Sequence, residues 1–271
     1  MLIETFNLIE GREYVKLTVY IQDRSPEIPL SELRPMVVVC PGGAYVFTSD
    51  REAEPIALHF INSGFNAAVV RYSVGGDAKY PDPLVDVSKA LKIIRYNHER
   101  YHTDPDKIAL CGFSAGGHLT AMMGVHWNRP EIVEEACCYN EENKPNALIL
   151  GYPVISSEFL FTHTESIRNI SGVREGELSQ EQKDFFACEK NIGKHTPPTF
   201  IVHTMKDQAV PVKNALVFAA GLEENNIDFE LHIFQDGFHG LALSDRRTNW
   251  INKDMAKWPE MASSWLWNRW E

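Results

Sequence analysis

One serine of this chain stands in a pentapeptide whose spacing suits nucleophilic chemistry. Residues 112–116 read G-x-S-x-G, with Ser114 at the centre, and they follow the short apolar run 107–111. This pattern is typical of a nucleophile elbow, a tight strand-to-helix turn that exposes the serine Oγ. Such a turn strains the serine backbone, and side chains at the flanking glycine positions would collide across it. A purely structural turn is the alternative, but the flanking elements favour a catalytic serine.

A serine nucleophile requires a base that takes its proton and an acid that orients this base. In parallel sheets the active site lies at the carboxyl ends of the strands, so both partners should follow strands. Asp207 follows the predicted strand 199–203, and His239 follows the predicted strand 228–234. The chain order Ser114, Asp207, His239 is the order of the α/β-hydrolase arrangement.

Other acidic and imidazole groups are weaker candidates for these two roles. Asp236 is nearer to His239 in sequence, but the QDG triplet that contains it is typical of a turn. His203 and His232 lie inside predicted strands, where we expect core or supporting positions. His118 follows the elbow on its predicted helix, and we expect it to pack beside the serine strand rather than act as the base.

Acyl transfer also requires hydrogen-bond donors for the developing oxyanion. One donor should be the amide of Ala115, the residue after the nucleophile. The others should come from the loop after the predicted strand 36–40, which begins PGGAY. We expect the amides of Gly43 and Ala44 to serve there, and a tight structural turn is the alternative explanation for the glycines.

The sequence contains no motif that indicates a bound nucleotide cofactor or a metal ion. The segment 112–117 has the glycine spacing of a P-loop, but His118 stands where that motif requires lysine. No G-x-G-x-x-G opens a dinucleotide-binding unit, and neither H-E-x-x-H nor paired cysteine spacing indicates zinc. We therefore expect no cofactor and no metal.

Strand and helix signals alternate from about residue 36 to the end of the chain. The alternation predicts βαβ units and an α/β fold, in which a mainly parallel central sheet is flanked by helices on both faces. A capping box at 49–52 predicts the start of the first helix, and the tail from Trp250 predicts the last one. The predicted strands are 36–40, 66–72, 107–111, 147–150, 199–203 and 228–234, and further predicted helices are 83–98, 115–125 and 213–222.

We expect the chain, residues 1–271, to form a single domain. The alternating segment 14–22 predicts an antiparallel hairpin at the edge of the sheet. Residues 155–197 have no strand signal and hold several phenylalanines, among them Phe159. This stretch is long for a connection, so it could form a lid or rim over the site.

Composition restricts the partners. Lys and Arg total 26 against 37 Asp and Glu, and a net charge of −11 opposes binding to nucleic acid or to an anionic membrane. No apolar run reaches the ~18 residues that span a bilayer. The odd cysteine count of five and a start without a secretory pattern favour reduced thiols and a cytoplasmic location. The tryptophan-rich tail could cover the core or the interface of a homo-oligomer, and core packing is favoured.

Several spaced segments together resemble the esterase/lipase branch of the α/β-hydrolases. More narrowly, they are similar to bacterial acetyl esterases and acetylxylan-esterase-like proteins related to the hormone-sensitive-lipase group. The resemblance implies Ser114 as nucleophile, Asp207 as acid, His239 as base and residues 42–44 as oxyanion loop. Pro41 stands where those lipase relatives begin their HGGG motif with histidine. The segments are PGGAYVFTSDREAEPIALHF, YPDPLVDVSKALKIIR, DPDKIALCGFSAGGHL, GYPVIS, PPTFIVHTMKDQAVPV and ELHIFQDGFHGL, within about residues 15–267.

The resemblance implies a serine carboxylesterase that hydrolyses short acyl esters, with acetylated sugars or xylo-oligosaccharides as candidate substrates. Residue patterns alone identify neither the acyl group nor the alcohol. An amide or peptide hydrolase, similar to formamidases or prolyl peptidases, is a second hypothesis that the same triad permits. A non-catalytic binding protein that reuses the fold is a third.

Overall fold

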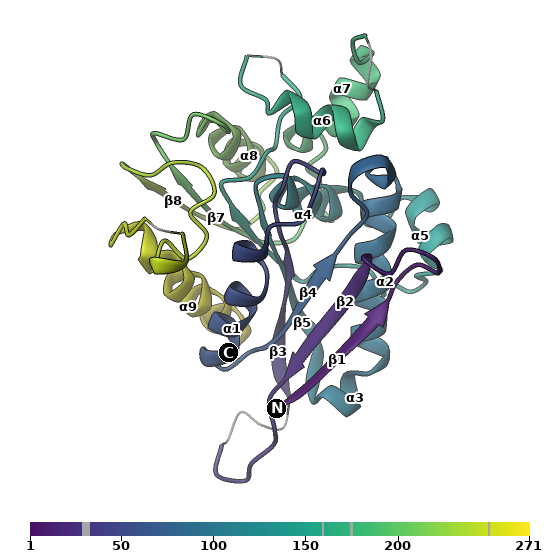
Figure 1. Cartoon of the computed structure of the whole chain (residues 1–271), viewed down its shortest axis with the longest axis vertical. Coiled ribbons are helices and arrows are strands. Elements are labelled where there is room, and N and C mark those ends of the chain that lie inside the picture. The colour runs from purple at the N-terminus through teal and green to yellow at the C-terminus, as the bar shows by residue number, and fades with distance from the viewer. Residues whose placement is uncertain (29–32, 159, 174–175, 249) are drawn as a thin grey trace.

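An eight-stranded sheet forms the centre of the computed structural model, which describes residues 1–28, 33–158, 160–173, 176–248 and 250–271. The strand order is β1-β2-β4-β3-β5-β6-β7-β8 (Figure 1). The strands are β1 Leu2–Asn7, β2 Lys16–Ile21, β3 Arg34–Cys40, β4 Asn66–Arg71, β5 Thr103–Phe113, β6 Ala147–Gly151, β7 Thr199–Thr204 and β8 Phe229–Phe234.

Parallel pairing dominates this sheet. From β4 through β3 to β8 every neighbouring pair is parallel, and Val39 stands opposite both Val69 and Cys111. The β1–β2 hairpin is antiparallel and joins the edge of the sheet through antiparallel pairing of β2 with β4. The prediction of a mainly parallel α/β sheet with an antiparallel edge hairpin is therefore confirmed.

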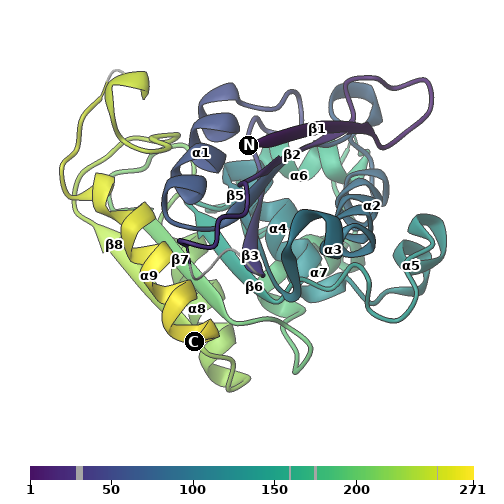
Figure 2. The ribbon, with the colours of Figure 1, turned by 90° about the horizontal axis from the view of Figure 1, so that it is seen from below.

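Helices cover both faces of the sheet, as the sequence predicts (Figure 2). Alternate strand residues face opposite sides, so Val37 and Val39 pack toward α1 and α9, whereas Met36 and Val38 pack toward α2, α4 and α8. The helices are α1 Glu54–Asn62, α2 Asp82–Tyr96, α3 His98–Tyr101, α4 Ser114–His126, α5 Pro130–Ala136, α6 Thr164–Ser171, α7 Gln180–Phe186, α8 Lys213–Glu224 and α9 Trp258–Trp270.

Two helix starts differ from the sequence prediction. Ser49 precedes a short 3-10 turn, Asp50–Glu52, and its side chain makes no capping hydrogen bond, so the predicted capping box is wrong. The helix α1 begins at Glu54, with a proline in its first turn. The last helix begins at Trp258 rather than near Trp250, again with proline in its first turn. Proline favours both starts because the first helical position needs no backbone N–H.

The segment 155–197 contains α6 and α7, which lie together at the top of Figure 1. Two hydrogen bonds attach α6 to the rest of the chain: Asn169 Nδ2 donates to the Ala44 carbonyl at 2.8 Å, and the Tyr80 amide donates to the Ile170 carbonyl at 2.8 Å. Phe159 lies outside the described residues. The single domain, with residues 155–197 as a lid or rim over the site, stays a prediction.

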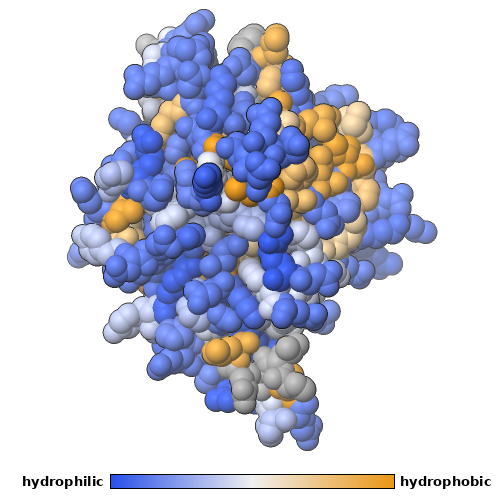
Figure 3. Space-filling view, turned by 180° about the vertical axis from the view of Figure 1, so that it is seen from behind, coloured by the Kyte–Doolittle hydropathy of each residue, from blue (hydrophilic) through white to orange (hydrophobic). Residues whose placement is uncertain are grey.

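Most of the back of the molecule is hydrophilic, and hydrophobic residues gather on one side of it (Figure 3). The formation of a homo-oligomer stays a prediction. All five cysteines are free, and Cys40 and Cys111 are buried in β3 and β5. Within the described ranges, the structure has no helix with the length and apolar character that a bilayer span requires.

Candidate active site

Ser114 is the first residue of α4 and follows directly on β5, which places it at the carboxyl end of a central strand. Its φ of 54° lies in the left-handed region that non-glycine residues rarely adopt. A Cβ at Gly112 would clash with the Gly116 carbonyl oxygen, and a Cβ at Gly116 would clash with the Cys40 carbonyl oxygen. Only glycine fits at these two positions, which is the steric role that the pentapeptide predicts.

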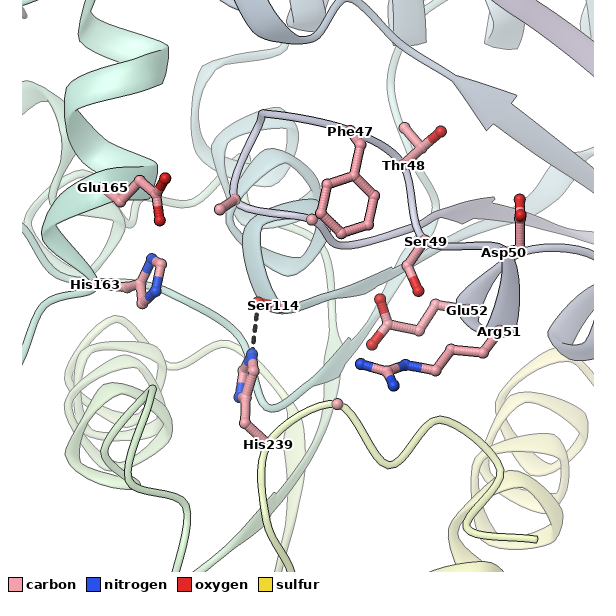
Figure 4. Close-up of a pocket in the computed structure, with 13 residues that line it drawn as sticks. Phe47, Thr48, Ser49, Asp50, Arg51, Glu52, Ser114, His163, Glu165 and His239 are labelled. Atoms are coloured by element: carbon pink, nitrogen blue, oxygen red, sulfur yellow. Dashed lines mark hydrogen bonds between the residues drawn. The ribbon is translucent and has the colours of Figure 1, made fainter. Parts of the chain in front are cut away.

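A continuous row of hydrogen bonds joins Ser114, His239 and Asp207. His239 Nε2 lies 2.7 Å from Ser114 Oγ (Figure 4), and its Nδ1 lies 2.7 Å from Asp207 Oδ2. A carboxylate only accepts hydrogen bonds, so Nδ1 carries the proton of the neutral ring. Nε2 is then an acceptor for the Ser114 hydroxyl, which is the arrangement that a general base requires.

The surroundings of Asp207 keep its carboxylate ionised. Burial alone would raise its pKa, but interactions with His203 and His239 and the Val210 amide hold the pKa well below its usual value. Oδ1 accepts hydrogen bonds from the amides of Ala209 and Val210 at 3.0 and 2.9 Å. An ionised Asp207 can stabilise the imidazolium that forms when His239 accepts a proton.

The weaker candidates of the sequence have other partners. Asp236 forms an ion pair with Lys206, and His232 lies 2.6 Å from a Glu230 carboxylate oxygen. His118 is fully buried, and its two ring nitrogens lie 2.9 Å from the Tyr45 hydroxyl and from the Phe186 carbonyl. Burial lowers the pKa of His118 to about 4. These residues lie in the positions expected for turn, strand and core groups, and the catalytic roles of Ser114, Asp207 and His239 stay predictions.

The predicted oxyanion loop has an unusual backbone. Gly43 and Ala44 have φ values of 128° and 55°, and a Cβ at Gly43 would clash with the Phe47 carbonyl oxygen. Among the described residues, the amides of these two residues have no intramolecular acceptor. Ala115 lies in the first turn of α4, where amides have no partner within the helix. The three predicted donors are thus near Ser114, and their role stays a prediction.

Glu52 fits the sequence pattern of a capping box, but in the structure its side chain is part of the site. Its carboxylate is 2% exposed and accepts hydrogen bonds from the Gly42 amide at 2.9 Å and from the Tyr152 hydroxyl at 2.8 Å. The Tyr152 hydroxyl in turn accepts from the Ala242 amide at 2.9 Å. The carboxylate therefore connects the oxyanion loop with the segments after β6 and β8. Its partners lie 10 and 100 residues away, so no local pattern could have indicated them.

Ser114 and His239 open into a cavity of about 540 Å³, whose polar side chains come from two directions (Figure 4). One group follows the oxyanion loop, and the other belongs to the start of α6. No three His, Cys, Asp or Glu side chains of the described chain are arranged to hold a metal ion. The lining residues are Gly43, Ala44, Phe47, Thr48, Ser49, Asp50, Arg51, Glu52, Ser114, His163, Glu165, His239 and Gly240.

His163 brings a hydrogen-bond donor to this cavity. Its Nδ1 accepts from the Ser166 amide at 3.4 Å as the N-cap of α6. Because an amide N–H only donates, Nδ1 is unprotonated and Nε2 carries the hydrogen. Burial and the nearby His239 lower the pKa of His163, which favours this neutral form. The cavity thus offers an N–H donor from the N-cap of α6 in addition to Ser114 and His239.

Comparison with known families agrees with this geometry. The sequence model of the BD-FAE family, a family of α/β-hydrolase esterases, matches residues 26–222 of the chain. The chain belongs to the BD-FAE family. The α/β-hydrolase fold expected from the spaced motifs is therefore confirmed, and so is the resemblance to esterases.

Two solved structures are similar to this chain over nearly its whole length. MGS-M1, an α/β-hydrolase enzyme from a Medee basin deep-sea metagenome library, is 33% identical with a TM-score of 0.78. An acetyl ester-xyloside bifunctional hydrolase from Caldicellulosiruptor lactoaceticus is 30% identical with a TM-score of 0.82. In both comparisons the alignment covers 98% of this chain and 96% of the other.

A curated relative, endo-1,4-beta-xylanase B from Butyrivibrio fibrisolvens, is 36% identical to this BD-FAE member over 220 residues. The match covers 78% of this chain but 33% of that protein. Two other curated relatives are also longer than this chain. The match covers 44% of a protein named acetylxylan esterase and 48% of a protein named probable carboxylic ester hydrolase.

Proposed function

We propose that this chain is a serine carboxylesterase that uses Ser114, His239 and Asp207 as its catalytic triad. The observation that carries the proposal is the hydrogen-bonded row from Asp207 through His239 to Ser114 on a strained elbow. Membership of an esterase family supports the reaction class. The geometry and the family thus favour an ester hydrolase over a binding protein that has lost its chemistry.

In the proposed mechanism Ser114 Oγ attacks the ester carbonyl while its proton moves to His239 Nε2. The amides of Gly43, Ala44 and Ala115 donate hydrogen bonds to the oxyanion of the tetrahedral intermediate. The intermediate then collapses, the bond to the leaving alcohol breaks, and His239 gives its proton to that alcohol. A water molecule attacks the acyl-enzyme with His239 again as base, which releases the acid and restores Ser114.

The proposed substrates are short acyl esters, in particular acetyl esters of sugars or xylo-oligosaccharides. The relatives named for acetyl ester, xyloside and xylan chemistry support this choice. The cavity supports the short acyl group as well, because its polar side chains Asp50, Arg51, His163 and Glu165 do not suit a long apolar chain. A neutral sugar ester also avoids the repulsion that an anionic substrate would meet at a chain of net charge −11.

Hydrolysis of an aryl acetate by wild type and by Ser114→Ala tests the proposal. Loss of Ser114 should lower kcat by roughly 10⁶-fold, as triad deletions do in other serine hydrolases, while the thermal unfolding temperature stays unchanged. A serine-directed phosphonate should label Ser114. Near-wild-type activity of the alanine variant, or labelling of another residue, would exclude Ser114 as nucleophile.

A matched pair of an aryl acetate and an aryl acetamide separates the two enzymatic hypotheses. We expect hydrolysis of the ester with little hydrolysis of the amide. Faster turnover of the amide would favour the amide or peptide hydrolase, and no turnover of either compound would favour a binding protein.

A further inference from the structure

A second cavity, of about 810 Å³, lies beside His239. The His239 side chain belongs to the lining of both cavities, so the histidine stands where they meet. The other lining residues follow the carboxyl ends of β7 and β8 or precede α9. They are Lys206, Gln208, Ala209, Asp236, Gly237, Phe238 and Trp250.

Two half-exposed aromatic rings form one wall of this second cavity. Phe238 is 42% exposed and Trp250 is 47% exposed. Their ring centroids are 5.1 Å apart and their planes form an angle of 84°, an edge-to-face contact that fixes the rings relative to each other. Because the aromatic core of the fold is complete without them, these rings are available to a ligand.

Hydrogen bonds hold the two aromatic segments together. Asn252 Nδ2 donates to the Asp236 carbonyl at 2.6 Å, which joins the segment before α9 to the loop after β8. The Thr248 hydroxyl donates to the Trp250 carbonyl at 3.1 Å. The wall is therefore built from positioned rings, and little ordering is required when a ligand binds.

Polar groups surround the aromatic wall. Lys206 and Asp236 form an ion pair at the cavity, and both side chains are more than half exposed. Gln208 adds an amide group. An aromatic surface with hydroxyl-binding groups around it suits a sugar, because a pyranose ring has a face of C–H bonds and an edge of hydroxyls. An acyl chain would use only the aromatic wall and would make no hydrogen bonds with these polar groups.

We propose that the second cavity binds the sugar part of the ester, which is the leaving alcohol. The inference rests on the proposed function, in which His239 protonates the alcohol oxygen. The alcohol must therefore leave beside His239, and the Phe238–Trp250 wall lies there. The ring packs on Trp250 and Phe238, and its hydroxyls bind Asp236, Lys206 and Gln208.

Trp250→Ala tests this subsite with two substrates, acetylated xylotriose and 4-nitrophenyl acetate. The variant should lose about three- to tenfold in kcat/KM on the acetylated trisaccharide, the scale of one lost aromatic contact. The aryl acetate, which has no sugar, should keep its kcat/KM within twofold. Trp250→Phe should restore part of the saccharide activity. Tyr96→Ala is the matched control, since Tyr96 is an 86% exposed aromatic residue on α2 outside both cavities.

A binding measurement keeps the test independent of turnover. Calorimetric titration of xylotriose into the Ser114→Ala protein should show binding. In the double variant Ser114→Ala/Trp250→Ala, the Kd for xylotriose should rise by about the same factor as the loss in kcat/KM. Equal losses on both substrates, or unchanged saccharide activity together with unchanged xylotriose binding, would overturn the subsite. Absence of aryl acetate hydrolysis by wild type would overturn the esterase proposal, whereas aryl acetate hydrolysis without xylotriose binding would overturn the subsite alone.

Discussion

The Glu52 carboxylate lies directly beneath the Gly42 backbone, with 2.9 Å between Oε2 and the Gly42 amide nitrogen. A Cβ at Gly42 would lie 2.7 Å from the same oxygen and 2.9 Å from Ser114 Cβ, so only glycine allows this approach. This hydrogen bond occupies the Gly42 amide, whereas the amides of Gly43 and Ala44 have no intramolecular acceptor within the described part of the chain. Tyr152 extends the contact to His239, whose ring centroid is 5.2 Å from its own.

Glu52→Gln should therefore reduce turnover more than it reduces stability. A glutamine has one acceptor oxygen, so it can accept from the Gly42 amide or from the Tyr152 hydroxyl but not from both. We expect kcat to fall by about 10–100-fold with little change in KM, because the oxyanion donors shift relative to Ser114. Kinetics on an aryl acetate together with thermal unfolding measure both effects.

Glu54→Gln is the control for this experiment. Glu54 is exposed at the start of α1, two residues from Glu52. Its substitution by glutamine removes the same charge from the same region. It should leave kcat unchanged. A similar decrease in both variants would indicate that net charge matters, and the specific contact with Gly42 would then be refuted.

Asp207→Asn should be far more damaging than Asp236→Asn. An asparagine at 207 can donate its own N–H to His239 Nδ1, which favours the tautomer with the hydrogen on Nε2 and prevents proton transfer from Ser114. With an aryl acetate as substrate, we expect kcat to fall by roughly 10³–10⁴-fold for Asp207→Asn. For Asp236→Asn we expect kcat on the same substrate to change by less than about twofold. The reverse ranking would identify Asp236 as the acid.

Stability should decrease on acidification because of His118. In the unfolded chain its pKa returns to about 6.5, whereas burial lowers it to about 4 in the folded protein. Between these values the unfolded state binds a proton that the folded state does not, so the free energy of unfolding falls by up to about 1.4 kcal/mol per pH unit as pH decreases. Urea unfolding of wild type and His118→Gln at pH 7, 6 and 5 measures this slope.

Glutamine at 118 does not titrate, so the variant should show a shallower decrease. Asp86 acts in the opposite sense, because burial raises its pKa to about 6, and its contribution cancels when the two proteins are compared at the same pH. His126, whose pKa burial also lowers to about 4, provides a second variant, His126→Gln, with the same expectation. Identical slopes in wild type and both variants would contradict the prediction.

Acyl chain length should separate a short-acyl esterase from a lipase-like enzyme. Phe47 lines the cavity beside Gly43 and Ala44, and we propose that it restricts the space available to the acyl group. A long apolar groove would stabilise the bound ester by about 0.8 kcal/mol for each added methylene. We expect kcat/KM on aryl esters to be highest for acyl groups of about two to four carbons and much lower for acyl groups of about eight carbons. A maximum at about eight carbons or more would refute the short-acyl pocket.

Local patterns in the sequence were enough to predict the mainly parallel sheet, its longer helices and the places of Ser114, Asp207 and His239 after strands. Strand and helix periodicity depends on residues within one turn or one pleat of each other, so it is visible without a structure. The same local reasoning identifies the elbow glycines and the strand before Ser114. It also identifies Asp207 and His239, because each follows a predicted strand. The sequence also carried the family resemblance, which rests on several short motifs.

Tertiary structure decided the groups whose partners are distant in sequence. Glu52 fits a capping pattern, but burial against Gly42 and Tyr152 makes it a connection between three loops. Trp250 fits a helical tail, but the final helix begins at Trp258 and leaves Trp250 on the wall of a cavity beside His239. A buried carboxylate requires hydrogen-bond donors, and those of Glu52 come from distant segments. An aromatic ring lines a cavity only where separate segments meet to form that cavity. Both conditions depend on the tertiary fold, so local sequence patterns do not reveal them.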